Sequence, residues 1–132
     1  MVKRRPYLSK SRIISAWQCA KKLYLEKHRP ELAEVSAQTE SLFSTGHQVG
    51  AVAREIYGTA DSVVIPFNRY MDQMVRETQL LLDAAVQDPI FEATFQYEDV
   101  LVRVDVLLPG EDGWRAIEVK ASTSVKDYHV LD

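Results

Sequence analysis

Asp105, Glu118 and Lys120 have the types and the spacing of residues that can activate water at a metal ion. Asp105 lies in one apolar segment and the pair Glu118-x-Lys120 in a second, with a glycine-flanked turn sequence at 110–113 between them. This pattern predicts a β-hairpin. If residues 110–113 form its loop, Asp105 falls directly opposite Glu118 on the neighbouring strand. One side of the hairpin then carries two carboxylates and an ammonium group.

The two sides of the predicted hairpin differ in polarity. Side chains alternate between the faces of a strand, and the same loop assignment pairs Pro109 with Trp114. Arg103 and Asp105 are predicted on one face of the first strand. The opposite face is predicted to be aliphatic and to carry Val100, Val102, Val104, Val106 and Leu108.

Opposed carboxylates of this kind favour a cation. Two ionised groups about 5 Å apart in a partly buried groove repel each other by about 3 kcal/mol at an effective dielectric near 20. The oxygens of Asp105 and Glu118 are hard ligands suited to Mg²⁺ or Mn²⁺, and the backbone carbonyl of Val119 is a candidate further ligand. Such an ion can polarise a phosphodiester oxygen and acidify a water that Lys120 positions. The residues therefore predict a site for metal-assisted hydrolysis.

A second interpretation of the same residues needs no metal. Arg103, Asp105, Glu118 and Lys120 can form a ladder of charges on an exposed strand face, where each pair contributes less than about 1 kcal/mol. A Glu-x-Lys sequence is also short enough to arise by chance. The residues alone leave both interpretations open.

Helices are predicted before the hairpin. Ser9 is a candidate N-cap for a helix from Lys10 to about His28, which Arg29-Pro30 ends. A second helix is predicted from Gln38 to Tyr57. It carries His47 and has Val49, Val52 and Ile56 among its apolar positions. A third helix is predicted over roughly Asn68–Val86.

Strands are predicted mainly in the last third of the chain. Residues 62–67 favour a short, peripheral extended segment, and Ile90–Tyr97 favours a strand that turns into the hairpin. Helices followed by a three-stranded antiparallel meander over residues 90–121 indicate an α/β fold of the α+β type. We expect one domain over residues 1–132.

Composition restricts the class of protein. A chain of 132 residues that is 46% hydrophobic can bury one core. It has no run of 18 apolar residues and no apolar segment after its basic start, so neither a membrane span nor a secretory signal is predicted. The single cysteine, Cys19, excludes an internal disulfide and favours the cytoplasm.

The charge is unevenly distributed along the chain. Residues 1–30 contain nine Lys and Arg but one acid, whereas the whole chain has a net charge of −3. A basic segment on an acidic body indicates contact with a polyanion, nucleic acid before membrane. The alternative is a solvated helix face. The candidate nucleic-acid contacts are Arg12, Lys21, Lys22 and Lys27.

Three segments resemble a known superfamily. They are residues 8–11 with 18–28, residues 45–50 (Thr-Gly-His-Gln-Val-Gly), and Arg103-Val-Asp105 together with residues 118–128. The last resembles the PD-(D/E)xK nuclease signature, although no Pro precedes Asp105. The whole pattern is similar to the RecB-like branch, which includes the CRISPR-associated exonucleases, and is closest to an uncharacterised bacterial RecB-like family.

The resemblance implies a restriction-endonuclease-like core and a Mg²⁺- or Mn²⁺-dependent nuclease. Its substrate would be DNA, either single-stranded or at duplex ends. Asp105 and Glu118 would hold the metal with His47, and Lys120 would serve the attacking water. Glu92, on the preceding strand, and Arg103 are candidates for supporting positions beside the metal ligands.

Two features depart from the family pattern. In the CRISPR-associated relatives, a cysteine at the place of Cys19 and three near the C-terminus hold an iron–sulfur cluster. The three partners are absent here, one thiolate cannot hold a cluster, and a helical Cys among apolar neighbours is expected to be buried. The Gln and Tyr of the family's next motif would follow Asp132, so we expect a truncated member or a chain completed by a further portion or by oligomerisation. The alternatives to an active nuclease are a non-catalytic nucleic-acid-binding or scaffold fragment and a purely structural piece of a larger protein.

Overall fold

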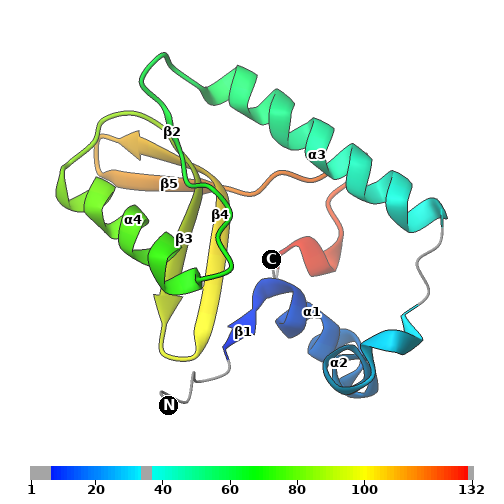
Figure 1. The fold of residues 1–132 in the computed structure, drawn as a ribbon. Helices are drawn as coiled ribbons and strands as arrows, with labels where there is room; N and C mark the ends of the chain where they lie inside the picture. Colours follow the sequence, from blue (N-terminus) through cyan, green and yellow to red (C-terminus); the bar gives the residue numbers. More distant parts are fainter. Residues whose placement is uncertain (1–6, 34–36, 131–132) are drawn as a thin grey trace.

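The computed structural model describes residues 7–33 and 37–130. These residues form a mixed sheet with helices on both faces (Figure 1). This part has a mixed α/β fold with four α-helices and five strands. The helices are α1 (Lys10–Gln18), α2 (Ala20–His28), α3 (Ala37–Tyr57) and α4 (Met71–Asp83), and 3₁₀ turns cover η1 (Pro30–Leu32) and η2 (Asp127–His129). The strands are β1 (Leu8–Ser9), β2 (Val63–Val64), β3 (Ile90–Tyr97), β4 (Val100–Gly110) and β5 (Gly113–Ile117).

Strands β3, β4 and β5 form the predicted antiparallel meander. The short strands β2 and β1 add parallel pairings to β3 and β4. On the edge of β4 that faces away from β3, β1 pairs at Val100 and Leu101, and β5 pairs from Val106 to Gly110. Residues 102–105 lie between these two ladders, so this edge of β4 is split into two paired ends with a gap.

The register of the hairpin agrees with the prediction, because Pro109 pairs with Trp114. The turn is tighter than predicted. Gly110 pairs with Gly113, which leaves two residues, 111 and 112, at the tip. Gly113 has φ +132°, a conformation that side-chain-bearing residues rarely adopt.

The predicted single helix over residues 10–28 is wrong, because Cys19 divides it into α1 and α2. Cys19 is extended, with φ −166° and ψ 116°. Its N–H donates to the Ser15 carbonyl at 2.9 Å, and its own carbonyl accepts from the Lys22 N–H at 2.9 Å. The residue thus closes α1 and begins α2. It is exposed, which also corrects the expectation that it is buried.

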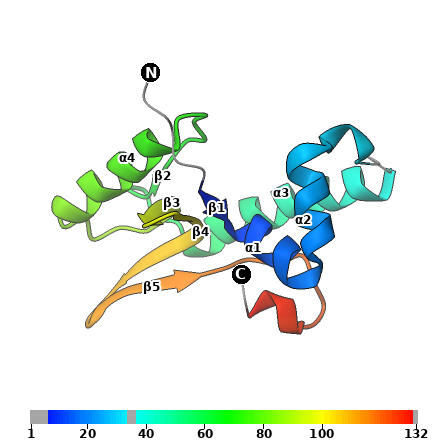
Figure 2. The ribbon, with the colours of Figure 1, turned by 90° about the horizontal axis from the view of Figure 1, so that it is seen from below.

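Two apolar clusters lie on opposite faces of the sheet. Leu107 belongs to a cluster with Met74 of α4, and the adjacent Val106 belongs to a cluster with Ala53 of α3. Successive residues of a strand point to opposite faces, so α4 and α3 cover different faces. Figure 2 shows α4 on one side of the strands. The core of the sheet is therefore built from both sides.

The face that α3 buries differs from the predicted one. Ala53 and Tyr57 pack in the second cluster, whereas Val52 and Ile56 are exposed. The described helices include none that is long and apolar enough to cross a bilayer. Of the basic N-terminal residues, Lys3, Arg4 and Arg5 lie outside the described part of the chain.

Buried threonines join α4 to the sheet. Thr78 and Thr94 are each 1% exposed. The Thr78 hydroxyl donates to the Met74 carbonyl at 3.0 Å and accepts from the Thr94 N–H at 2.8 Å. One side chain thereby satisfies a buried strand N–H and holds the helix against β3.

Candidate functional site at the edge of strand β4

The gap in the edge of β4 brings the two ends of the chain together. β1 leads directly into α1 at Lys10, and β5 ends at Ile117 so that residues 118–120 leave the sheet beside Asp105. Figure 1 shows α1 and the segment after β5 on the same side of the sheet. Asp105, Glu118, Lys120 and Lys10 therefore meet at one place.

Asp105 is held by the backbone of the segment that follows β5. The Val119 N–H donates to Asp105 Oδ2 at 2.7 Å. A side chain thus replaces a strand carbonyl as the acceptor, which accounts for the end of the ladder at Ile117. The meander therefore ends before residue 121, its predicted last residue. The Val119 side chain packs in the α3 cluster. The segment after β5, and not a residue of β4, therefore fixes the orientation of the Asp105 side chain.

The pKa of Asp105 is raised above its usual value. Burial of the carboxyl group is the largest cause, and the negative charges of Glu118 and Glu92 raise it further. The Val119 hydrogen bond and the positive charge of Lys10 oppose this shift. Asp105 therefore lies where an added cation is electrostatically favourable.

Glu118 is paired with a lysine on each oxygen. Lys10 Nζ lies 2.6 Å from Oε2, and Lys120 Nζ lies 2.7 Å from Oε1. The Lys10 and Glu118 side chains are 17% and 26% exposed, respectively. The Lys10–Glu118 contact is charge-assisted and partly buried, unlike a pair of the exposed ladder, whereas the Lys120–Glu118 contact is exposed, as the second interpretation predicts.

Glu92 lies on β3, on one side of β4, and Glu118 follows β5 on the other side, so Asp105 of β4 lies between the two glutamates. The register pairs Phe91 with Val106 and Ala93 with Val104, so Glu92 faces Asp105. Its φ is +61°, an uncommon conformation for a side-chain-bearing residue.

The face alternation of the sheet changes at this position. Val104 packs against the α4 cluster, whereas Val106 lies in the α3 cluster. The prediction that Val100, Val102, Val104, Val106 and Leu108 share one face is therefore wrong. The change occurs at Glu92, whose φ of +61° departs from strand geometry, while the register of β3 with β4 is the same on both sides of this residue.

Two arginines accompany Glu92. Arg103 Nε lies 3.1 Å from Glu92 Oε2 without hydrogen-bond alignment, and Arg54 Nη2 lies 3.4 Å from Oε1. Three acids in line across β3, β4 and the end of β5 are thus matched by four bases, Lys10, Arg54, Arg103 and Lys120. The four positive charges of these bases exceed the three negative charges of the acids.

His47 lies exposed on α3. Among the side chains that the structure describes, no three of His, Cys, Asp or Glu are grouped closely enough to hold a metal ion. The structure therefore brings Asp105 and Glu118 together but does not assemble a three-ligand set with His47. The role of His47 stays a prediction.

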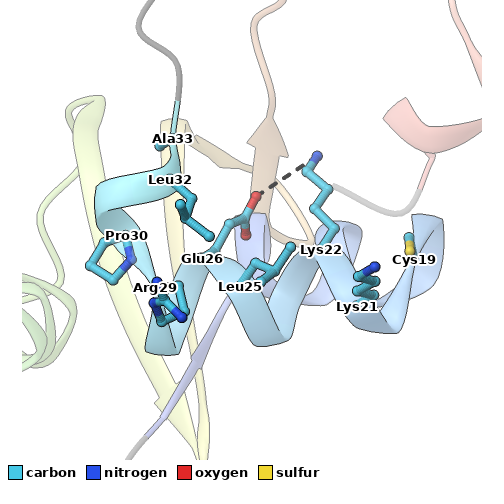
Figure 3. Close-up of a pocket in the computed structure, with 9 residues that line it drawn as sticks. All are labelled: Cys19, Lys21, Lys22, Leu25, Glu26, Arg29, Pro30, Leu32 and Ala33. Atoms are coloured by element: carbon cyan, nitrogen blue, oxygen red, sulfur yellow. Dashed lines mark ion pairs between the residues drawn. The ribbon is translucent and has the colours of Figure 1, made fainter.

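The predicted nucleic-acid contacts lie along α1 and α2. Lys21 and Lys27 are exposed, and Arg12 Nη1 donates to the Tyr7 carbonyl at 3.1 Å. Lys22 Nζ donates to Gln18 Oε1 at 2.9 Å and lies 3.9 Å from Glu26 Oε1. Figure 3 shows the ion pair between Lys22 and Glu26. The four bases are spread over two helices that meet at an angle, so they do not form one helix face.

Sequence reasoning missed Lys10, Arg54 and His129 as members of the site. Lys10 stands in the Leu-Ser-Lys-Ser segment that carried part of the family resemblance, which was the available signal. His129 of η2 lines two hollows together with Lys120, of about 390 and 400 Å³. Its Nδ1 accepts from the Lys126 N–H at 3.2 Å.

Comparison with known proteins found no matching family model, curated protein or solved structure.

Proposed function

We propose that the chain is a divalent-metal-dependent nuclease that hydrolyses DNA phosphodiester bonds, with a core of the restriction-endonuclease type. One observation carries the proposal. Asp105 and the Glu118-x-Lys120 sequence meet in the gap at the edge of β4, where Asp105 accepts the Val119 N–H at 2.7 Å. The two carboxylates thus come from the middle of β4 and from the residue that follows the end of β5.

The residues fit a magnesium or manganese ion through two carboxylates. Mg²⁺ is commonly held by one or two carboxylates, with waters and substrate oxygens completing its shell. Asp105 and Glu118 would supply these ligands, with the Val119 carbonyl as a candidate third. The pKa of Asp105 is raised first by burial and then by neighbouring acids. A cation bound there would favour the ionised carboxylate and so lower this pKa. Bound there, the ion would polarise a phosphodiester oxygen and acidify a water.

The lysines of the site have their own part in the proposed reaction. Lys120 lies 2.7 Å from Glu118 and is held where its ammonium can orient a water or stabilise negative charge developing on a phosphate. Lys10 places a second positive charge beside the same carboxylate. The basic side chains of α1 and α2, Arg12, Lys21, Lys22 and Lys27, would contact the DNA backbone.

A second candidate function is a non-catalytic nucleic-acid-binding or scaffold domain. The observation that favours it is the pairing of both Glu118 oxygens with lysines, 2.6 Å from Lys10 and 2.7 Å from Lys120. A carboxylate so engaged must release a lysine before it can bind a metal. In this alternative, DNA binding persists without cleavage.

Cleavage of labelled single-stranded and duplex-end DNA separates the two functions. We expect degradation with Mn²⁺ or Mg²⁺ that stops with EDTA. Asp105→Ala and Glu118→Ala should abolish it, whereas Asp112→Ala at the exposed hairpin tip is the matched control and should retain it. Cleavage by either site variant at the wild-type rate would refute the site assignment, and salt-sensitive DNA binding with no cleavage would favour the second function.

A further inference from the structure

A hollow between α1 and the start of α4 adjoins the carboxylate site. Its cavity has a volume of about 330 Å³, within the range of about 300–1,000 Å³ usual for small-molecule sites. It contacts the carboxylate site through Lys10, which pairs with Glu118, and through Arg103, which lies 3.1 Å from Glu92. We call it the α1–α4 pocket.

The lining of the α1–α4 pocket combines apolar side chains with two cationic ones. Ile14, Met71, Met74 and Leu101 supply apolar surface, and Lys10 and Arg103 supply positive charge. An apolar lining with a few converging polar groups is the usual character of a ligand site. The occupant that this combination fits has a flat or apolar body and an anionic group.

An exposed aromatic ring at the mouth narrows the class of occupant. Phe67 lines the pocket and is 69% exposed. The Arg103 guanidinium lies 5.5 Å from the centre of its ring, and Arg103 Nη2 donates to the Ile65 carbonyl at 3.4 Å. The ring and the guanidinium are thus held together as two planar surfaces. Planar surfaces of these two kinds stack on nucleobases.

We propose that the α1–α4 pocket binds the base of one nucleotide, with the attached phosphate at Lys10 and Arg103. The pocket would then hold an unstacked base next to the scissile phosphate at Asp105 and Glu118. This inference rests on the proposed function for one point, that the bound nucleotide belongs to DNA. Base binding itself requires no cleavage, and the two ideas can therefore fail separately.

Calorimetric titration with dAMP in EDTA tests the pocket without any metal chemistry. We expect dAMP to bind the full chain and deoxyribose 5-phosphate, which lacks the base, to bind at least 5-fold more weakly. Phe67→Ala should weaken dAMP binding by about 5- to 150-fold, because loss of base–aromatic stacking typically costs about 1–3 kcal/mol. Phe67→Leu should weaken it as well, since leucine keeps apolar surface but has no flat ring.

The matched control is Tyr97→Ala. Tyr97 is an aromatic residue at the end of β3, is 79% exposed and is not part of the pocket lining. Its replacement should leave dAMP affinity unchanged, and the exposure of both aromatics means that neither replacement should impair folding. Absence of dAMP binding, equal binding of the sugar phosphate, or equal affinity of the Phe67→Ala and Tyr97→Ala variants would overturn the inference.

Cleavage data keep this outcome distinct from that of the proposed function. Phe67-dependent dAMP binding in a protein that cleaves no DNA would refute the nuclease and leave the pocket. Asp105-dependent cleavage in a protein whose dAMP binding ignores Phe67 would refute the pocket and leave the nuclease.

Discussion

Replacing Lys10 with methionine tests whether the first helix is tied to the candidate site by charge. The substitution removes the ammonium that lies 2.6 Å from Glu118 Oε2 and keeps an unbranched apolar side chain of similar length. We expect the variant to be less stable than the wild type. We also expect a further rise in the pKa of Asp105, because Lys10 is one of the groups that lower it.

The size of the effect can be bounded from the geometry. Unit charges 2.6 Å apart attract by about 6 kcal/mol at an effective dielectric near 20, which is an upper limit. Desolvation of both groups reduces this figure, and Lys120 at 2.7 Å continues to neutralise Glu118 after the change. Hydrogen bonds to charged groups contribute about 1.5–3 kcal/mol net. With the second lysine in place, we expect a coupling of about 1–2 kcal/mol.

A double-mutant cycle measures this coupling. Lys10→Met, Glu118→Gln and the double variant would be unfolded in urea at low and at high salt, with exposed Lys21→Met as the control. The coupling should persist at high salt better than that of an exposed pair, since both side chains are partly buried. A coupling below about 0.5 kcal/mol, the usual error of additivity, would refute the reasoning.

Two further predictions concern buried polar groups. The folded-state pKa of Asp105 is raised, so the stability that this carboxyl contributes is present below its unfolded pKa and falls as the pH rises through its folded pKa. In urea unfolding from pH 3 to 7, Asp105→Asn should therefore gain stability relative to the wild type as the pH rises through that interval. A stability difference that does not change with pH would contradict this. Thr78→Val should lose about 1–3 kcal/mol, because the buried Thr94 N–H loses its acceptor. Thr78→Ser keeps the hydroxyl and should lose less in the same assay.

The pairing of Glu118 with two lysines affects how a metal ion could bind to this carboxylate in the proposed nuclease. A metal ion must compete with Lys10 or Lys120 for a carboxylate oxygen. A phosphate group that attracts these lysines would make such an exchange easier, because it replaces one anionic partner with another. In the nuclease, DNA and metal binding are therefore expected to favour each other.

Local pattern predicted several elements well. The strand Ile90–Tyr97 has the predicted bounds, the second helix begins one residue before its predicted start and ends at Tyr57 as predicted, and Pro109 pairs with Trp114. These features depend on near neighbours in the chain, on apolar spacing and on turn residues. The short parallel strand at 63–64 is also peripheral, as Pro66 indicated.

The errors concern a helix break, the buried face of a helix and the alternation of a strand. The helix over residues 10–28 has no proline or glycine inside it, yet Cys19 interrupts it. The apolar positions Val52 and Ile56 are exposed while Ala53 faces the sheet. Strand alternation predicted one face for Val104 and Val106, which the distortion at Glu92 divides between two clusters.

For the candidate site, the amino-acid pattern alone predicts the hairpin, its register and hence the position of Asp105 opposite Glu118. Strand pairing across a short turn is a local matter, and a two-residue period leaves little freedom. The contact of Lys10 with Glu118, and the position of Glu92 beside Asp105 and close to two arginines, arise from the fold of the whole chain. Those contacts join residues as many as 108 positions apart. They depend on which edge of β4 accepts β1, and the order of strands in a sheet cannot be read from local periodicity.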